Sequence, residues 1–300
     1  MPDLSKLPSI DQLLQWENVQ TLQSHYGRSL ALRALRSVLD EIRQALLQGE
    51  GEFPKKSEVT HRVHKVLESW VSPTLMTVIN ASGVILHTNL GRAPLSSETL
   101  QAIQEAARGY SNLEFNLQTG KRGTRATHAS RLLALLTETE GGFVVNNNAG
   151  AVLVALAALA SGKNVLVSRT QLVEIGGGFR IPDVMRQSGA QLLEVGTTNR
   201  VHLYDFEDAL QSQDIAMVLV AHHSNFKLIG FHSEPALNEI VDVAHQYDVP
   251  VMHDVGSGAL LDTADYGLAH EPMVQESVAA GCDLVCFSGD KLVGGPQAGI

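Results

Sequence analysis

Apolar residues recur at helical spacing over residues 9–48 and again over 60–70. The clearest stretch begins near residue 28 and is followed by Gly49, a residue type that often ends helices. Its apolar stripe consists of Leu30, Leu32, Leu35, Val38, Leu39, Ile42, Leu46 and Leu47. Residues 49–58, rich in Gly, Pro and charge, separate the two stretches as a loop would. The pattern predicts a small helical domain over residues 1–72.

From about residue 76 the pattern changes to short apolar runs that alternate with amphipathic stretches. The strand candidates are 143–146, 164–168, 191–195, 217–222, 249–254 and 283–288, and helical spacing is clearest at 128–140 and 234–248. Strands that are apolar on both faces and separated by helices indicate a mostly parallel sheet covered on both sides. The pattern predicts an α/β domain over residues 73–300, in which ligands bind at the carboxyl ends of the strands.

Composition and charge limit the domain organisation and the classes of binding partner that the chain can have. The chain has 300 residues, of which 44% are hydrophobic, so it can build one large core and a smaller appendage. Its formal charge of −10 disfavours indiscriminate binding to polyanions. Residues 1–70 hold nine basic and nine acidic residues, leaving 13 basic and 23 acidic residues for the rest. The helical domain is therefore neutral, while the remainder is acidic.

The compartment is predicted from two further features. The first residues lack the apolar core of a signal peptide, and the longest apolar run, 151–160, is too short to span a bilayer, so we expect a cytosolic protein without membrane contact. Cys282 and Cys286 lie four residues apart on a predicted strand, roughly 13 Å at about 3.3 Å per residue, and cannot bridge each other.

The twelve histidines show no metal-ligand spacing, so no metal is expected.

The segment "FVVNNNAGAVLVAL" runs from an apolar stretch through amides and small residues into a helix. This order places the backbone N–H groups of Ala149, Gly150 and Ala151 at a helix amino terminus, where free donors and the helix dipole favour an anion. The alternative interpretation is an ordinary helix start. The motif alone is a weak signal.

Two charged residues follow neighbouring predicted strands. Asp254 ends "VPVMHD", and Lys291 follows "DLVCFSGD". An Asp and a Lys beside a phosphate-sized anion site match the needs of pyridoxal phosphate, in which the lysine forms a Schiff base and the Asp keeps the ring nitrogen protonated. Ser288 can add a hydroxyl to the phosphate site or be a turn residue. Asp290 can position the lysine or a substrate group, or only balance the lysine's charge.

Five long stretches together resemble the bacterial selenocysteine synthase family, the L-seryl-tRNA(Sec) selenium transferases. They are "VINASGVILHTNLGRAPLS" (78–96), "VVNNNAGAVL" (144–153), "LVEIGGGFRIPDVMRQSGA" (172–190), "EVGTTNR" (194–200) and "SGDKLVGGPQAGI" (288–300). The resemblance implies the large domain of a fold-type-I pyridoxal phosphate enzyme preceded by the family's helical domain. It also implies that a carboxy-terminal small domain is missing after Ile300. We therefore expect these 300 residues to be a fragment that is not fully active alone.

The resemblance further implies conversion of L-seryl-tRNA(Sec) to L-selenocysteinyl-tRNA(Sec) with selenophosphate, through an aminoacrylyl intermediate on the cofactor. Lys291, once freed from the cofactor, would move the Cα proton. Arg92 matches a family arginine implicated in anion binding and would receive selenophosphate, since guanidinium donates two parallel hydrogen bonds to such groups. The alternative role of Arg92 is that of a structural loop arginine.

Other candidate contacts are weaker. Asn225 can hydrogen-bond the ring oxygen of the cofactor or cap a strand end. The basic loop 121–125 can touch phosphate or tRNA or be solvated, and the helical domain would grip tRNA in the family. The candidate tRNA and substrate residues are Lys121, Arg122, Arg125, Arg33 and Arg36. The family also forms homo-oligomers, a ring of dimers.

Two other classes of function stay open. A related lyase or aldolase would use the same cofactor on a small amino acid or sugar acid without tRNA. A scaffold protein with an inactive fold would keep the architecture alone. The helical domain over residues 1–72 favours the selenium transferase over the first alternative, and the intact Asp254 and Lys291 argue against the second.

Overall fold

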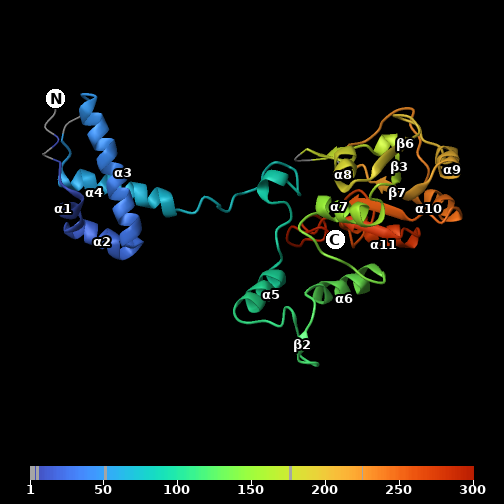
Figure 1. Cartoon of the computed structure of the whole chain (residues 1–300), viewed down its shortest axis with the longest axis horizontal. Coiled ribbons are helices and arrows are strands. Elements are labelled where there is room, and N and C mark those ends of the chain that lie inside the picture. Colours follow the sequence, from blue (N-terminus) through green and yellow to red (C-terminus); the bar gives the residue numbers. More distant parts are fainter. Residues whose placement is uncertain (1–3, 5–6, 51–52, 176–177, 225) are drawn as a thin grey trace. The chain divides into compact units, whose positions relative to one another are not determined.

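The chain forms two compact units, Met1–Ile79 and Asn80–Ile300, in the computed structural model. The structure describes residue 4 and residues 7–50, 53–175, 178–224 and 226–300. Figure 1 draws the first unit in blue to cyan and the second in cyan to red. The sequence prediction placed the boundary near residue 72, and the last helix of the first unit ends at Val71.

The described part of the first unit is helical. Its helices are α1 (Ile10–Leu14), α2 (Glu17–Tyr26), α3 (Arg28–Leu47) and α4 (Lys56–Val71). Ser9 begins α1 with a capping box that includes Gln12, and Gly27, with φ of +84°, separates α2 from α3. The apolar stripe of α3 packs with Val63 and Leu67 of α4 in one buried cluster. Five predicted stripe residues are buried, namely Leu35, Val38, Leu39, Ile42 and Leu46.

A five-stranded sheet forms the centre of the second unit, with the order β6-β3-β7-β8-β9 and every pairing parallel. The strands are β3 (Asn164–Ser168), β6 (Gln191–Val195), β7 (Ile215–Ala221), β8 (Val251–Gly256) and β9 (Leu284–Phe287). The predicted fold class, a mostly parallel sheet flanked by helices with helices before it, is confirmed. β8 continues two residues beyond Asp254, where the prediction ended it.

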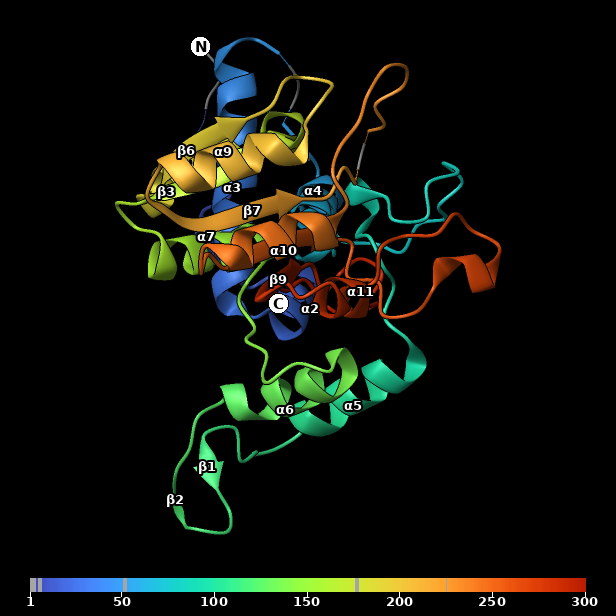
Figure 2. The same cartoon turned by 90° about the vertical axis from the view of Figure 1, so that its right-hand side faces the viewer.

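Helices cover both faces of this sheet because successive side chains of its strands point to opposite sides. Val165 and Val167 of β3 join the cluster that includes α7 (Asn148–Leu159) and α8 (Ile181–Ser188). Leu166, between them, joins the cluster of α9 (Leu203–Ser212) and α10 (Leu237–Gln246). Figure 2 shows α9 and α10 over one face of the sheet. The short helix α11 (Val274–Ala279) contacts β9.

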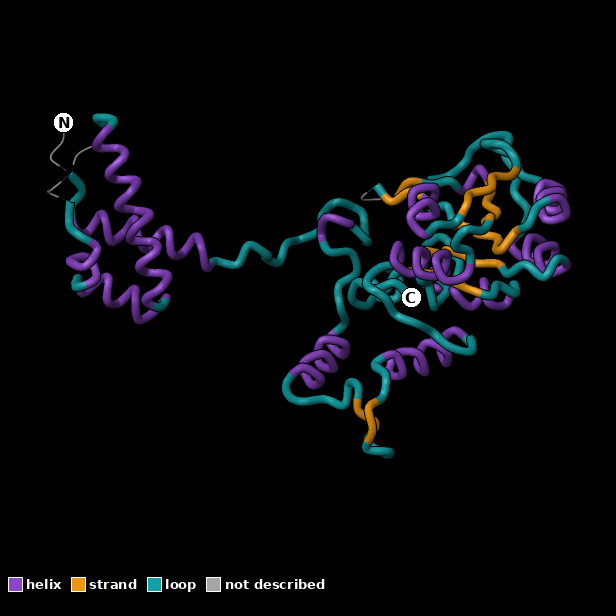
Figure 3. Tube along the Cα trace, viewed as in Figure 1, coloured by secondary structure: helices purple, strands orange, loops and turns teal. Residues whose placement is uncertain are grey.

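The remaining elements of the second unit are short or lie outside the sheet. They are the 3₁₀ turns η2 (Thr88–Leu90), η3 (Arg169–Gln171) and η4 (Thr263–Tyr266), helices α5 (Ser97–Ala107) and α6 (Ala126–Thr137), and strands β1 (Phe115–Asn116), β2 (Lys121–Arg122), β4 (Glu174–Ile175) and β5 (Phe179–Arg180). The short strands form two antiparallel pairs. Figure 3 shows the loops that join α5, the β1–β2 pair and α6.

The predicted strand at 143–146 is wrong. In this stretch only Val145 pairs, through a single antiparallel bridge with Gly299 in which each residue donates to the other over 2.8 and 2.9 Å. An apolar run becomes a strand only where a neighbouring strand continues the ladder. Here one residue finds such a partner.

Candidate active site

Lys291 and Asp254 meet above Gly256 at the carboxyl end of β8. A Cβ atom placed on Gly256 would lie 3.7 Å from Lys291 Nζ and 3.9 Å from Asp254 Oδ1. Gly256 has a φ of +68°, in the left-handed region that favours glycine, and the pairing between β8 and β9 shifts register there. The bulge lets the strand turn beneath the two charged groups. The structure thus brings together the two residues that the sequence singled out.

The lysine amine is half-buried, and its surroundings lower the pKa. Burial is the largest cause, followed by the positive charge of Arg92, while Asp254, Asp290 and Glu271 oppose the shift. An amine with a lowered pKa is more often unprotonated, and the unprotonated amine is the nucleophile. Lys291 is therefore suited to bond covalently to a carbonyl carbon.

Asp254 is 5% exposed, and burial raises its pKa. A hydrogen bond from Asn148 opposes this shift, with Nδ2 of the amide 2.7 Å from Asp254 Oδ1. The charge of Lys291 and the Gly256 backbone N–H act in the same direction as Asn148. Sequence reasoning missed Asn148, although it lies in the "NNNAG" run that predicted the anion site.

The amino terminus of α7 has fewer open donors than the sequence suggested. Gly150 N–H donates to Asn147 Oδ1 over 2.8 Å, and Ala151 N–H donates to the Asn147 carbonyl over 3.1 Å. Of the three predicted donors, Ala149 is the one whose N–H has no acceptor among the described residues. A pocket of about 480 Å³ opens at this turn and is also lined by Arg180. The turn and the pocket leave room for an anion the size of a phosphate group.

Arg92 and Asp290 form a partly buried ion pair beside Lys291. Arg92 Nη1 donates to both carboxyl oxygens over 2.9 and 3.0 Å, and the Ala93 N–H donates to the Asp290 carbonyl over 3.2 Å. Arg92 has a φ of +61°, a strained conformation for a residue with a Cβ. Both residues line a pocket of about 380 Å³. Asp290 therefore contacts Arg92, a pairing that the sequence did not predict.

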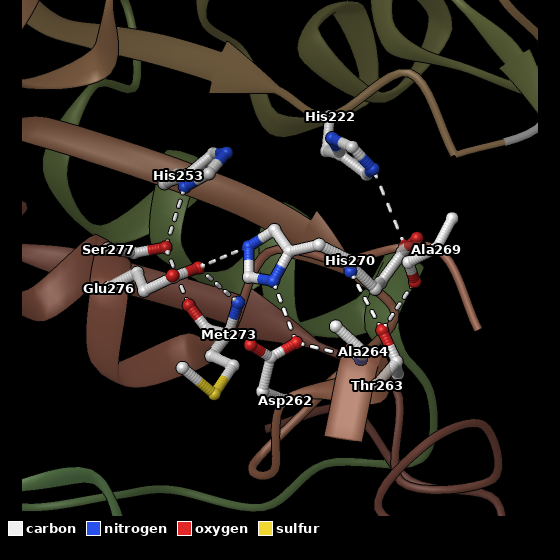
Figure 4. A network of polar contacts seen from close by, with 11 residues as sticks. His222, His253, Asp262, Thr263, Ala264, Ala269, His270, Met273, Glu276 and Ser277 are labelled. Carbon is white, nitrogen blue, oxygen red and sulfur yellow. Dashed lines mark hydrogen bonds and ion pairs between the residues drawn. The ribbon is translucent and has the colours of Figure 1, made fainter. Parts of the chain in front are cut away.

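A histidine–glutamate pair near these residues was not predicted. His222 follows β7 directly, and its Nε2 lies 3.4 Å from Glu271 Oε1. The pKa of Glu271 is lowered first by the hydrogen bond from His222 and also by the charge of Lys291. Figure 4 shows His222 with His253 and His270 in the surrounding polar network. The signal in the sequence was a histidine at the end of an apolar run.

The other predicted residues lie in several places. Ser288 is buried directly after β9, and its N–H donates to the Gly256 carbonyl over 3.1 Å. Asn225 lies outside the described residues. Arg122 and Arg125 both bind Glu114, over 2.9 and 2.5 Å, on the exposed loop that also carries Lys121.

The two arginines predicted in the helical unit lie on α3. The guanidinium of Arg33 lies over the ring of Trp70, 5.2 Å from its centroid, and Arg36 is exposed. Asp40, four residues after Arg36 on the same helix, binds Arg43 over 2.5 Å. Arg36 thus remains an exposed cation on α3.

The residues at the carboxyl ends of β8 and β9 and at the amino terminus of α7 fit pyridoxal phosphate. The amine of Lys291, the buried carboxyl of Asp254 and the Ala149 N–H supply the three kinds of group that the cofactor's aldehyde, ring nitrogen and phosphate require. Gly256 presents no side chain between the amine and the carboxyl. The described residues contain no cluster of three or more His, Cys, Asp or Glu side chains suited to a metal ion. None of the described helices is both long and apolar enough to cross a membrane.

Comparison with known proteins identifies the family. Residues 78–300 match the family model for L-seryl-tRNA selenium transferase, and residues 4–43 match that for the selenocysteine synthase N terminal. The chain is 50% identical to the L-seryl-tRNA(Sec) selenium transferase of Geobacter metallireducens over 99% of its own length and 64% of the relative. It is 49% identical to that of Alkaliphilus metalliredigens over the same shares. The chain thus spans about 64% of the length of these curated relatives.

A solved structure supports the fold. D-glucosaminate-6-phosphate ammonia-lyase matches with a TM-score of 0.56 at 19% identity, over 71% of this chain and 54% of the other. Similarity at 19% identity shows a shared architecture alone. Identities near 50% over 99% of the chain show common descent. The chain belongs to the L-seryl-tRNA selenium transferase family.

Proposed function

We propose that the protein containing this chain converts L-seryl-tRNA(Sec) to L-selenocysteinyl-tRNA(Sec), with selenophosphate as the selenium donor and pyridoxal phosphate as the cofactor. The observation that carries the proposal is the half-buried Lys291 amine next to the buried Asp254 carboxyl above Gly256. Relatives at 46–50% identity carry the same transferase name. The alternative, a lyase or aldolase without tRNA, has no observation in its favour.

Each residue of the site has a role that follows from its chemistry. When bound, pyridoxal phosphate withdraws electrons from the Cα of the seryl group, which eases loss of the Cα proton and the β-hydroxyl. Lys291 binds the cofactor and, when free, takes the proton from Cα. Asp254 holds the proton on the ring nitrogen, and Ala149 and Ser288 bind the phosphate. These assignments use residues that follow or lie within β8 and β9 and one residue at the amino terminus of α7.

Arg92 is the proposed receiver for selenophosphate, with Asp290 as its positioning residue. The pair fixes the guanidinium beside Lys291, and the pocket of about 380 Å³ next to it is open to an anion. Selenium then forms a bond with the β carbon that lost its hydroxyl as water, and water cleaves the selenium–phosphorus bond to give phosphate. The cation stabilises the anionic donor during this step.

The helical unit is proposed to bind the tRNA, with Arg33 and Arg36 among the contacts. Its balance of nine basic and nine acidic residues means that tRNA recognition there does not rest on bulk charge. We also propose that the protein works in the cytoplasm as a homo-oligomer, a ring of dimers, so that several subunits can contribute to one tRNA site. Lys121, Arg122 and Arg125 remain candidates for contact with phosphate or tRNA.

Borohydride reduction tests the cofactor, and tRNA binding tests the substrate. After loading with pyridoxal phosphate and reduction, peptide mass mapping of the full natural protein is expected to find the cofactor on Lys291. Filter binding is expected to show tighter binding of seryl-tRNA(Sec) than of other seryl-tRNA. An unmodified Lys291 would exclude the proposed site, and equal binding of both tRNAs would favour the lyase or aldolase.

A further inference from the structure

Asn148 links the amino terminus of α7 to the carboxyl end of β8. Its Nδ2 donates to Asp254 Oδ1 over 2.7 Å, although the two residues are 106 positions apart. The orientation of this amide follows from charge. An ionised carboxylate can only accept hydrogen bonds, so a reversed amide would set two acceptors against each other at the same distance.

The amide of Asn148 is held on one side alone. Its Oδ1 atom is buried and accepts no hydrogen bond from the described residues. A buried amide oxygen without a donor is unfavourable, so the bond to Asp254 must outweigh this loss to keep the side chain in place. The neighbouring residues make other contacts. Asn147 caps the helix by accepting from the Gly150 N–H, and the Ala149 N–H has no acceptor among the described residues. Asn148 is therefore the member of the turn whose side chain reaches the acid.

We propose that Asn148 is a positioning residue that couples the phosphate-binding turn to the Asp254 carboxyl and keeps this carboxyl ionised and oriented toward the cofactor's ring nitrogen. The inference rests on the proposed function, since it requires pyridoxal phosphate at this site. A phosphate bound at the turn holds the start of α7 in place. The Asn148 hydrogen bond then holds the Asp254 carboxyl in a fixed orientation. An acid left without the donor would be protonated more readily and could not hold the ring nitrogen's proton.

The charges around Asp254 support this assignment. Burial raises the pKa of Asp254, and the Asn148 hydrogen bond is the largest opposing influence. Lys291 and His222 also favour the ionised form through their charge, and the Gly256 backbone N–H does so through a hydrogen bond. The charge of Lys291 depends on its chemical state, because the nitrogen is uncharged when its bond to the cofactor's aldehyde carbon is unprotonated. The Asn148 amide, by contrast, does not titrate, so it keeps its donor whatever the charge of Lys291.

The test uses the full natural protein loaded with pyridoxal phosphate that carries ¹⁵N at the ring nitrogen. Asn148→Leu keeps the number and branching of the side-chain heavy atoms and removes the donor. The ring nitrogen signal is expected to move from the protonated toward the unprotonated position, and the cofactor dissociation constant is expected to rise about tenfold or more. Asn148→Asp has nearly the same shape and replaces the donor with a carboxylate, so it repeats the test if the leucine variant fails to fold.

Asn147→Ala is the matched control on the same turn. It removes the cap to Gly150 but leaves the donor to Asp254. We expect weaker cofactor binding with an unchanged ring nitrogen signal, a pattern that separates helix capping from positioning of the acid. A wild-type nitrogen signal in both cofactor-loaded Asn148 variants would overturn the inference. Absence of cofactor binding by the wild-type protein would instead overturn the proposed function.

A second measurement needs no cofactor. A ¹³C NMR titration of the Asp254 carboxyl in the cofactor-free protein is expected to give a higher pKa in Asn148→Leu than in the wild type, because burial is then less opposed. The Asn147→Ala control is expected to keep the wild-type value. An unchanged Asp254 pKa in Asn148→Leu would show that the hydrogen bond does not hold the carboxyl ionised.

Discussion

Arg92 combines an ion pair with a strained backbone, and the two can be separated by substitution. Its side chain is 27% exposed and that of Asp290 is 11% exposed, so loss of the arginine leaves a largely buried carboxylate without its cation. Its φ of +61° suits glycine, which has no Cβ to strain. The proposed receiver for selenophosphate is thus also a residue with a strained backbone, a combination that is common at binding sites.

We predict that Arg92→Ala lowers the free energy of unfolding by about 2–3 kcal/mol, because it removes a charged hydrogen bond to a buried acceptor. Arg92→Gly should be less destabilising by about 1 kcal/mol, since it also relieves the left-handed conformation. Urea denaturation of both variants measures the difference. Equal midpoints would show that the backbone at residue 92 is not strained, and neither variant should retain tight selenophosphate binding.

At the scale of elements, the segment from η4 to α11 is held by His270. Its Nδ1 lies 2.9 Å from Asp262 Oδ1 and its Nε2 lies 3.2 Å from Glu276 Oε2, as Figure 4 shows. Asp262 also caps η4 through the Ala264 N–H, and Glu276 binds the Met273 N–H at the start of α11. One imidazolium thus joins both ends of the segment that carries Glu271 toward His222.

This arrangement predicts a pH window for the segment 262–276. The pKa of His270 is raised from 6.5, first by the hydrogen bond to Asp262, so its stabilisation is complete below 6.5 and is lost as pH rises through the raised value. The pKa of Asp262 is lowered from 3.8, so its stabilisation is present above 3.8 and is lost as pH falls through the lowered value. Protection is therefore expected to be greatest between these limits.

Hydrogen exchange of the amides in this segment measures the effect. We expect faster exchange at alkaline pH than at pH 6, after correction for the intrinsic pH dependence of exchange. His270→Gln should abolish the difference, because its amide does not titrate. Persistence of the difference in this variant would assign the pH dependence to a group other than His270.

At the scale of the whole molecule, local pattern predicted most elements, and long-range contacts escaped it. Val and Leu on both faces predicted the parallel strands, and their ends located Asp254 and Lys291. The Arg92–Asp290 pair joins residues 198 positions apart, and no periodicity reports such a contact. The expected strand at 143–146 failed for the same reason, since its ladder depends on a partner far along the chain.

The two units have separate hydrophobic clusters, which predicts that they can be destabilised separately. Leu35 is fully buried among the helices of the first unit, whereas Leu47 on the same helix is 46% exposed. Leu35→Ala should lower the stability of this unit by about 3 kcal/mol, a large share of what so small a core supplies. Leu47→Ala, the control, should stay within about 0.5 kcal/mol of the wild type.

The measurement is hydrogen exchange in the full natural protein, with binding of seryl-tRNA(Sec) and of pyridoxal phosphate followed in parallel. In Leu35→Ala we expect faster exchange over 10–71 and weaker tRNA binding, while exchange over the parallel strands and cofactor binding keep their wild-type values. Because each unit has its own buried cluster among the described residues, damage should stay in the unit where it is introduced. If Leu35→Ala loses cofactor binding and Leu47→Ala does not, the first unit supports the cofactor site by a route other than the packing of its buried cluster.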